Sequence, residues 1–329
     1  QATEPPLAVT GNLAPEIAAP QAVNELAVAS FNVENLDPND PQLKFDTLAS
    51  QIVNNLQKPD IVGLMEMQDN DGPPNSTTLS ASTTFSKLIS AIQAAGGPTY
   101  QFRQINPSDD KDGGQPGGNI RVGFLFNPAR VSFIDRSGGT ATRANAVLAG
   151  PQLQYSPGRI DPQNAAFNSS RKPLAGEFSF NGKKLFVVAN HFNSKGGDQP
   201  LFGRYQPPAR SSEVQRQQQA GIVANFVQSI LALDANANVI VLGDLNDFEF
   251  SSSVNILKNA GLYDLVETLP PEERYTYVYE GNSQVLDHIM ASGNLRFNAA
   301  AQYDVVHVNS EFAGAASDHE PEVARFYLP

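Results

Sequence analysis

Acidic and amide residues follow the apolar segments of this sequence, and the clearest case lies near residue 240. The apolar run 239–242 is followed almost at once by Asp244 and Asn246. A carboxylate can take a proton from an attacking water, and an amide beside it can hold that water or a phosphoryl oxygen. The two residues are two positions apart, so a continuing strand would place them on one face. The pair indicates hydrolytic chemistry at the end of a buried strand.

Residues of the same kinds stand at the ends of several other apolar runs. They are Asn32 in SFNVEN, Glu66 in GLMEM, His191 in VVANHFNSK, Asp287 in VLDHI, and Asp318 with His319 in SDHEP. One such residue by itself is more often a cap or a turn former. Several oxygen ligands that converge on one point would suit a hard cation such as Mg²⁺, Mn²⁺ or Ca²⁺. The prediction of a metal site therefore rests on the whole set.

Strands and helices alternate along the part of the chain that carries these residues. We expect strands at 26–36, 60–67, 100–105, 119–127, 131–134, 174–180, 183–192, 239–242, 275–280, 284–292, 303–309 and 322–328, and helices at 37–56, 83–97, 211–231 and 252–262. Asp40 is expected to cap the first helix, with Pro41 in its first turn and an apolar stripe along one side. Asn181-Gly182 predicts a type I′ hairpin turn. The pattern indicates an α/β protein in which two mixed β-sheets pack together with helices outside.

The composition limits the class of protein. The chain has 329 residues, 40% of them hydrophobic, and a formal charge of −12 from 22 Lys plus Arg against 34 Asp plus Glu. This balance argues against a long basic groove for nucleic acid. Cysteine is absent, which excludes disulfides, thiolate metal sites and cysteine nucleophiles. The sequence has no apolar run of transmembrane length, so no membrane span is expected.

The first residues differ in composition from the rest. Residues 1–25 are rich in Pro and Ala without a core pattern, whereas residues 26–329 carry every candidate site residue. We expect a flexible N-terminal segment followed by a single catalytic domain. The segment resembles the exposed leader of a mature exported protein, which favours a secreted or periplasmic location. The alternative is that the chain was simply shortened.

Taken in order along the chain, these motifs resemble the endonuclease/exonuclease/phosphatase superfamily, which includes deoxyribonuclease I. The segments NHFNSKG at 190–196 and NIRVGFLFNPARV at 119–131 add to the resemblance, which covers about residues 26–328. The sequences of these motifs most resemble those of secreted bacterial members described as extracellular nucleases or phosphatases. The resemblance implies a four-layered α/β sandwich and a phosphoesterase that uses a divalent metal.

The resemblance also implies a role for each residue at the metal and the water. Glu66 would bind the metal, and Asn32 would position the metal or a phosphate oxygen. Asp318 would join the metal shell; alone, it would be read as a turn cap. Asp244 would polarise or deprotonate the attacking water, and Asn246 would hold that water or a phosphoryl oxygen.

Histidines would supply the charged donors. His319 would contact the phosphoryl oxygens, while Asp287 would orient it and favour the imidazolium form. His191 would do similar work from the other side of the site. The remaining histidines, His288 and His307, are expected to be structural.

Several cations are candidate substrate ligands. Arg121 could reach a phosphate or pair with an acid at the edge of the core. Residues 195–216 form a locally basic stretch that could grip substrate or be a solvated loop, and its cations are Lys195, Arg204, Arg210 and Arg216. The active-site tyrosine of the family has three candidates, which are Tyr155, Tyr205 and Tyr275.

Other hydrolase motifs are missing, including G-x-S-x-G, H-E-x-x-H and the phosphate-binding G-x-x-x-x-G-K-[ST] loop. The expected function is therefore hydrolysis of small or terminal phosphoesters by direct attack of water, in a monomer. An extracellular endonuclease or exonuclease acting on DNA or RNA is the alternative. A catalytically idle, calcium-dependent binding protein is more remote, because binding alone needs no Asp244/Asn246 and Asp287/His319 pairs.

Overall fold

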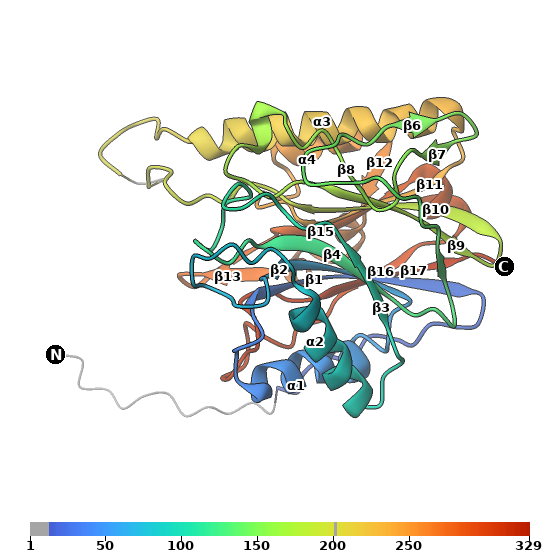
Figure 1. The fold of residues 1–329 in the computed structure, drawn as a ribbon, viewed down its shortest axis with the longest axis horizontal. Helices are drawn as coiled ribbons and strands as arrows, with labels where there is room; N and C mark the ends of the chain where they lie inside the picture. Colours follow the sequence, from blue (N-terminus) through green and yellow to red (C-terminus); the bar gives the residue numbers. More distant parts are fainter. Residues whose placement is uncertain (1–12, 201–202) are drawn as a thin grey trace.

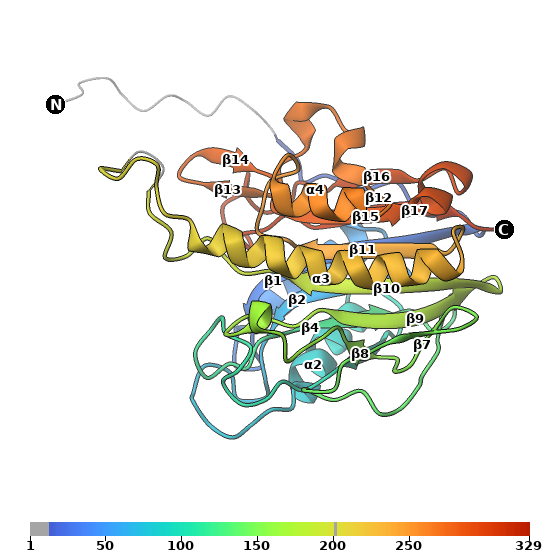
Figure 2. The same ribbon diagram turned by 90° about the horizontal axis from the view of Figure 1, so that it is seen from above.

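The computed structural model describes residues 13–200 and 203–329. Within these ranges two mixed β-sheets face each other, and helices cover the outer face of each sheet (Figures 1 and 2). The order of layers is helix, sheet, sheet, helix. This arrangement confirms the predicted four-layered α/β sandwich.

The first sheet has six strands among the described residues. In spatial order they are β16 (Gln302–Val305), β17 (Glu322–Tyr327), β1 (Glu25–Leu36), β2 (Ile61–Met67), β4 (Arg121–Phe126) and β3 (Gln101–Gln104). β1 and β2 run parallel, and the other neighbours are antiparallel. Its outer face carries α1 (Gln42–Ser50), which continues into the π-helical turn η1 (Gln51–Asn55), and α2 (Ser82–Ala94).

The second sheet is built around one parallel pair. Its strands in order are β12 (Leu262–Asp264), β15 (Asp287–Ser292), β11 (Asn238–Asp244), β10 (Lys183–His191), β9 (Leu174–Phe180) and β5 (Ser132–Phe133), with β8 (Gly158–Arg159) also on β9. β10 and β11 run parallel, whereas β15 is antiparallel to β11. The helices α3 (Ser211–Leu233) and α4 (Ser252–Asn259) cover this sheet (Figure 2).

Short elements complete the described chain. They are the strand pairs β6 (Val147–Leu148) with β7 (Gln152–Leu153) and β13 (Tyr277–Tyr279) with β14 (Asn282–Gln284), and the short helices η2 (Ala165–Phe167), η3 (Leu265–Thr268), η4 (Pro271–Glu273) and η5 (Asn294–Asn298). None of the helices in the described ranges has the length and apolar character that a membrane span needs.

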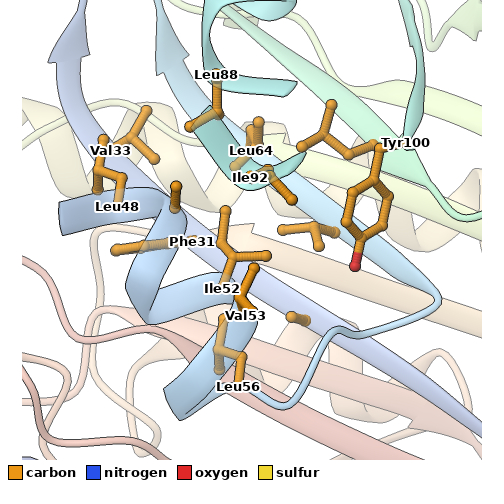
Figure 3. Packing of buried hydrophobic residues seen from close by; sticks show 14 of the residues in the cluster. Phe31, Val33, Leu48, Ile52, Val53, Leu56, Leu64, Leu88, Ile92 and Tyr100 are labelled. Carbon is orange, nitrogen blue, oxygen red and sulfur yellow. The ribbon is translucent and has the colours of Figure 1, made fainter. Parts of the chain in front are cut away.

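Apolar side chains fix the strands that carry site residues. Figure 3 shows the layer between the first sheet and its helices, where Phe31 of β1 and Leu64 of β2 pack with Ile52, Leu88 and Ile92. All five side chains are fully buried. Each contributes roughly 1.5–3 kcal/mol relative to an exposed position. This packing holds the ends of β1 and β2, each of which carries one site residue, in a defined place.

The first helix confirms one local prediction and corrects another. The predicted apolar stripe of Phe45, Leu48, Ile52 and Leu56 is buried. Asp40, however, does not cap the helix. Pro41 holds the N-cap position with no side-chain capping bond, and the Asp40 carboxylate accepts from the backbone N–H of residue 37 instead.

Two further predictions concern the hairpin and the N-terminal segment. Asn181 and Gly182 both have positive φ, at 47° and 74°, which a type I′ turn requires. Residues 1–12 of the predicted flexible segment lie outside the described residues. The described remainder contacts the domain: Ala18 is buried, and its N–H donates to the Asn55 carbonyl at 2.8 Å.

Candidate active site

Three predicted site residues form one row across the second sheet. The parallel register pairs His191 of β10 with Asp244 of β11, and the antiparallel register pairs Asp244 with Asp287 of β15. Residues paired in register on neighbouring strands lie side by side. The row stands at the sheet end where β10 and β11 finish and β15 begins, and all three side chains are buried. The fold therefore brings together residues that are up to 96 positions apart.

Asn32 connects this row to the first sheet. Its amide nitrogen Nδ2 donates to Asp244 Oδ2 at 3.2 Å and to Glu66 Oε1 at 3.4 Å. The Glu66 carboxylate also accepts from the N–H of Asn35 at 2.8 Å. The side-chain oxygen of Asn32, Oδ1, accepts from the Glu34 N–H at 3.1 Å. In this arrangement the amide nitrogen of Asn32 faces the two carboxylates, so Asn32 connects Asp244 with Glu66. Its role toward a metal stays a prediction.

A tight turn joins Asp244 to Asn246. β11 ends at Asp244, and the Asn246 N–H donates to Asp244 Oδ1 at 2.8 Å while its side-chain amide donates to Oδ2 at 3.1 Å. Asn246 has a φ of 52°, so the turn, and not strand periodicity, brings the two side chains together. Gly243 precedes them with a φ of 124°, and a Cβ there would lie 2.0 Å from the carbonyl oxygen of Asn190.

Asp287 holds His319 in the site. His319 Nδ1 is 2.6 Å from Asp287 Oδ2, and His319 Nε2 lies 3.9 Å from Asp244 Oδ2. Burial tends to lower the pKa of His319, but the hydrogen-bonded charge of Asp287, together with Asp244 and Asp318, raises this pKa well above its usual value. The geometry thus favours an imidazolium with Nε2 available to a ligand. The orienting contact is as the sequence predicts.

The pKa values of Asp244 and His191 are shifted in opposite directions, and these shifts suit a general base and a neutral imidazole. Burial first, and then the charge of Asp287, raises the pKa of Asp244 to about 7. Burial and the charges of Arg171 and His319 lower the pKa of His191 well below its usual value. His191 Nε2 lies 3.5 Å from Asp244 Oδ2. The lowered pKa favours a neutral imidazole at His191, whereas the resemblance implies a charged donor there.

The residues enclose a cavity of about 430 Å³. Its lining includes Glu66, His191, Lys195, Asp244, Asn246, Tyr277, Tyr279, Gln284, Leu286 and His319. Lys195 Nζ donates to the Asn246 carbonyl, and burial lowers its pKa to about 8. Asp318 lies at the rim with its side chain 47% exposed and Oδ1 3.9 Å from His319 Nε2.

The carboxylates fit a divalent cation. Ligand atoms of Asp244, Asp287 and His319 all lie within 4.8 Å of one another. Asp287 Oδ2 is already bonded to His319, and both oxygens of Asp244 accept from Asn246. Two further predicted ligands stand nearby: Glu66 lines the cavity, and Asp318 Oδ1 lies 3.9 Å from His319 Nε2. Oxygen donors of this kind suit Mg²⁺, Mn²⁺ or Ca²⁺.

Two predicted substrate cations are buried and bind other groups of the protein. Arg121 is buried and donates to the carbonyls of Leu79 and Asn119, so the prediction of a phosphate ligand is wrong. Arg216 is also buried, in an ion pair with Asp247 at 3.1 Å, and the prediction that it grips substrate is wrong.

The two remaining cations of the basic stretch are exposed. Arg210 pairs with Glu213 at 3.1 Å, and Arg204 lies over the ring of Tyr205. Neither belongs to the lining of the cavity described above. Of the four cations predicted between 195 and 216, Lys195 is the one at the site.

Sequence reasoning missed Tyr277, whose ring centroid is 4.8 Å from that of His319. The three tyrosines considered lie elsewhere: Tyr155 contacts Gln154, Tyr205 is exposed, and Tyr275 stacks on His307. The signal was the alternation of tyrosines at 275, 277 and 279, which predicts a shared strand face but does not say which ring reaches the site.

Two charged residues were also missed. Arg171 is buried, donates to the Phe192 carbonyl at 2.7 Å and lies near the charges of Glu66 and Asp244. Glu34 lies near Asp318 and Glu66, and its pKa is raised by burial first and by Asp318 next. For Arg171, the available signal in the sequence was the basic pair at 171–172, just before a buried strand.

The other two histidines are structural, as predicted. His288 is fully buried between Asp264, at 2.8 Å, and the carbonyl of Asp247, at 2.9 Å. His307 binds the carboxylate of Glu16 at 3.1 Å.

Comparison with known proteins decides the family. Residues 29–319 match the Endonuclease/Exonuclease/phosphatase family, which is most of the chain. The chain belongs to this family. Members of the family are phosphoesterases that typically use a divalent metal, and the buried Asp244, Asp287 and His319 group is present here. No curated protein sequence matches the chain.

Solved structures of family members share the fold. A truncated TDP2 from Caenorhabditis elegans is 19% identical, with a TM-score of 0.57 over 92% of this chain and 98% of that one. An endonuclease/exonuclease/phosphatase from Bacteroides vulgatus is 16% identical, with a TM-score of 0.57 over 93% and 99%. TDP2 from D. rerio, complexed with a single-strand DNA product, is 19% identical, with a TM-score of 0.54 over 92% and 98%. At these identities the likeness concerns the fold.

Proposed function

We propose that this family member is a divalent-metal-dependent phosphoesterase that hydrolyses small or terminal phosphoesters by in-line attack of water. The observation that supports it most is the buried row of His191, Asp244 and Asp287, joined to His319 at 2.6 Å and to Glu66 through Asn32. A binding module would need neither a carboxylate with a raised pKa nor a charged histidine beside it. This argues against the idle, calcium-dependent alternative.

The residues divide the chemistry between them. Asp244, whose pKa is about 7, takes a proton from the water as the water oxygen bonds to phosphorus and the bond to the leaving oxygen breaks. His319 and Lys195 donate to the phosphoryl oxygens, where negative charge gathers. Glu66 and Asp318 would hold the cation, which when bound would supply Lewis-acid stabilisation of that charge.

The charge of the chain favours small substrates over long ones. A formal charge of −12 repels a polyanion at long range, whereas a small ester feels mainly the local site. The alternative is an extracellular nuclease. The D. rerio TDP2 complex, which holds a single-strand DNA product, supports the view that this fold can accept a single DNA strand. We also propose that the protein is exported from the cell and acts as a monomer.

One set of assays tests the proposal. The purified chain is given bis(p-nitrophenyl) phosphate, p-nitrophenyl phosphate, a short single strand and plasmid duplex, each with Mg²⁺, Mn²⁺ or Ca²⁺ and with excess EDTA. We expect hydrolysis that EDTA abolishes and that is at least as fast on the small esters or short strand as on duplex. Asp244→Asn should remove it, which excludes a contaminating nuclease. Full activity in EDTA without a tightly held ion, or no activity on any ester, would refute the proposal.

A further inference from the structure

Aromatic side chains extend the active-site cavity beyond the residues that do the chemistry. Tyr277 and Tyr279 of β13 line the cavity. Phe248 and Phe250, in the segment after β11, line a neighbouring hollow of about 480 Å³. Gln284 of β14 belongs to both linings, so the two hollows share a wall. We call these four rings the aromatic rim; hairpin β13–β14 lies at one end of the sheets in both views (Figures 1 and 2).

The rings of the aromatic rim are paired and nearly parallel. Those of Tyr277 and Tyr279 are 6.5 Å apart between centroids and within 12° of parallel. Those of Phe248 and Phe250 are 5.3 Å apart and within 26°. Tyr277 also contacts the ring of His319, at 4.8 Å. A planar group held on these rings would therefore lie next to a phosphate at His319.

Two of the four side chains in the aromatic rim are exposed to solvent, which is a feature of ligand-binding sites. Tyr279 is 54% exposed and Phe250 is 71% exposed, although both stand at a cavity in a protein with fully buried phenylalanines elsewhere. Clustered exposed aromatic rings are typical of binding sites. The charge is mixed: Lys195 Nζ lies 4.5 Å from the Phe248 ring, while the second hollow is lined by two acids and one cation, Glu249, Glu272 and Arg274. The rim suits flat, uncharged rings better than a row of phosphates.

We infer that the aromatic rim binds the base of a nucleoside attached to the scissile phosphate, which makes the substrate class nucleotides or the ends of single strands. The inference rests on the proposed phosphoesterase function. Bases stack on aromatic side chains largely without regard to sequence. An inositol or sugar phosphate offers no flat π-face to these rings. A base-paired duplex keeps its bases stacked on each other and therefore unavailable to the rim.

The test compares two substrates that differ only in their bases. The full chain, with Mg²⁺ or Mn²⁺, hydrolyses a thymidine trinucleotide and its abasic analogue, in which tetrahydrofuran replaces each nucleoside while the charge stays the same. We expect kcat/KM to favour the trinucleotide by on the order of 10-fold per stacked base. Tyr279→Ala should bring the ratio of the two values close to one. Tyr263→Ala, which removes a tyrosine that is 44% exposed on β12, is the matched control and should keep the ratio of the unaltered chain.

Separate outcomes bear on the two proposals. Equal kcat/KM with and without bases, or a Tyr279→Ala ratio like that of the control, overturns the inference and leaves the phosphoesterase proposal standing. If no ester is hydrolysed, the proposed function fails. Binding of the two trinucleotides by isothermal titration then tests the inference, which equal affinities would refute.

Discussion

Replacing Asp287 by Asn removes the charge behind His319 and keeps the size of the side chain. Both residues are buried, and Oδ2 lies 2.6 Å from Nδ1, so water screens the pair weakly. Two unit charges about 4 Å apart interact by about 4 kcal/mol at an effective dielectric constant of 20. Each 1.36 kcal/mol is about tenfold in rate, so we expect a loss on the order of 10²–10⁴ in kcat. His319→Ala should cost a similar factor, and the double variant little more.

The pH profile gives the same prediction a second readout. Asp287 raises the pKa of both His319 and Asp244. Without its charge, the imidazolium is lost at lower pH and the Asp244 carboxylate forms at lower pH. Both limbs of the profile of kcat/KM against pH should therefore move to lower pH in Asp287→Asn.

The assay is hydrolysis of bis(p-nitrophenyl) phosphate from about pH 5 to pH 10 at saturating metal. Asp135→Asn, which changes an exposed acid paired with Arg103 at 2.7 Å, is the matched acid-to-amide control. Thermal unfolding of each variant distinguishes a loss of stability from a loss of catalytic activity. Independent, additive losses in the two single variants, or limbs that stay in place, would show that Asp287 does not act through His319.

Three further predictions concern buried charges. Burial tends to lower the pKa of His288, but Asp264 raises it from 6.5 to about 9. The pair should therefore stabilise the fold fully below pH 6.5 and lose its contribution, on the order of 3 kcal/mol, as the pH rises through about 9. Urea unfolding of the unaltered chain and of His288→Gln at pH 6 and pH 10 measures this, and equal pH dependence of the two proteins would contradict it. Arg216→Ala removes the guanidinium from Asp247, which keeps Lys195 at 3.8 Å and two serine hydroxyls, and should lower the free energy of unfolding by about 3 kcal/mol. A raised KM at unchanged stability would instead indicate that Arg216 grips the substrate. Lys195→Met should lower kcat/KM on the order of 10-fold, and an unchanged kcat/KM would remove Lys195 from the site.

Residue types and their order were enough to predict the fold class and several of the residues that line the candidate site. Apolar runs beside Asn32, Glu66, His191, Asp244 and Asp287 predict buried strands that carry polar site residues. Motif order then indicates the family, which residues 29–319 confirm. Local turn chemistry was also readable, as the hairpin at Asn181-Gly182 illustrates.

Tertiary structure alone decided which cations and rings reach the site. Arg121 and Arg216 look like phosphate ligands in sequence, yet their partners are carbonyls and Asp247, contributed by distant segments. Tyr277 could not be chosen from three alternating tyrosines, since strand periodicity gives a face and no target. The same holds for the charge of Asp244: its pKa of about 7 follows from burial and from the approach of Asp287, 43 residues away. Burial and the approach of distant charges exist only after the two sheets have packed, so no local pattern can encode them.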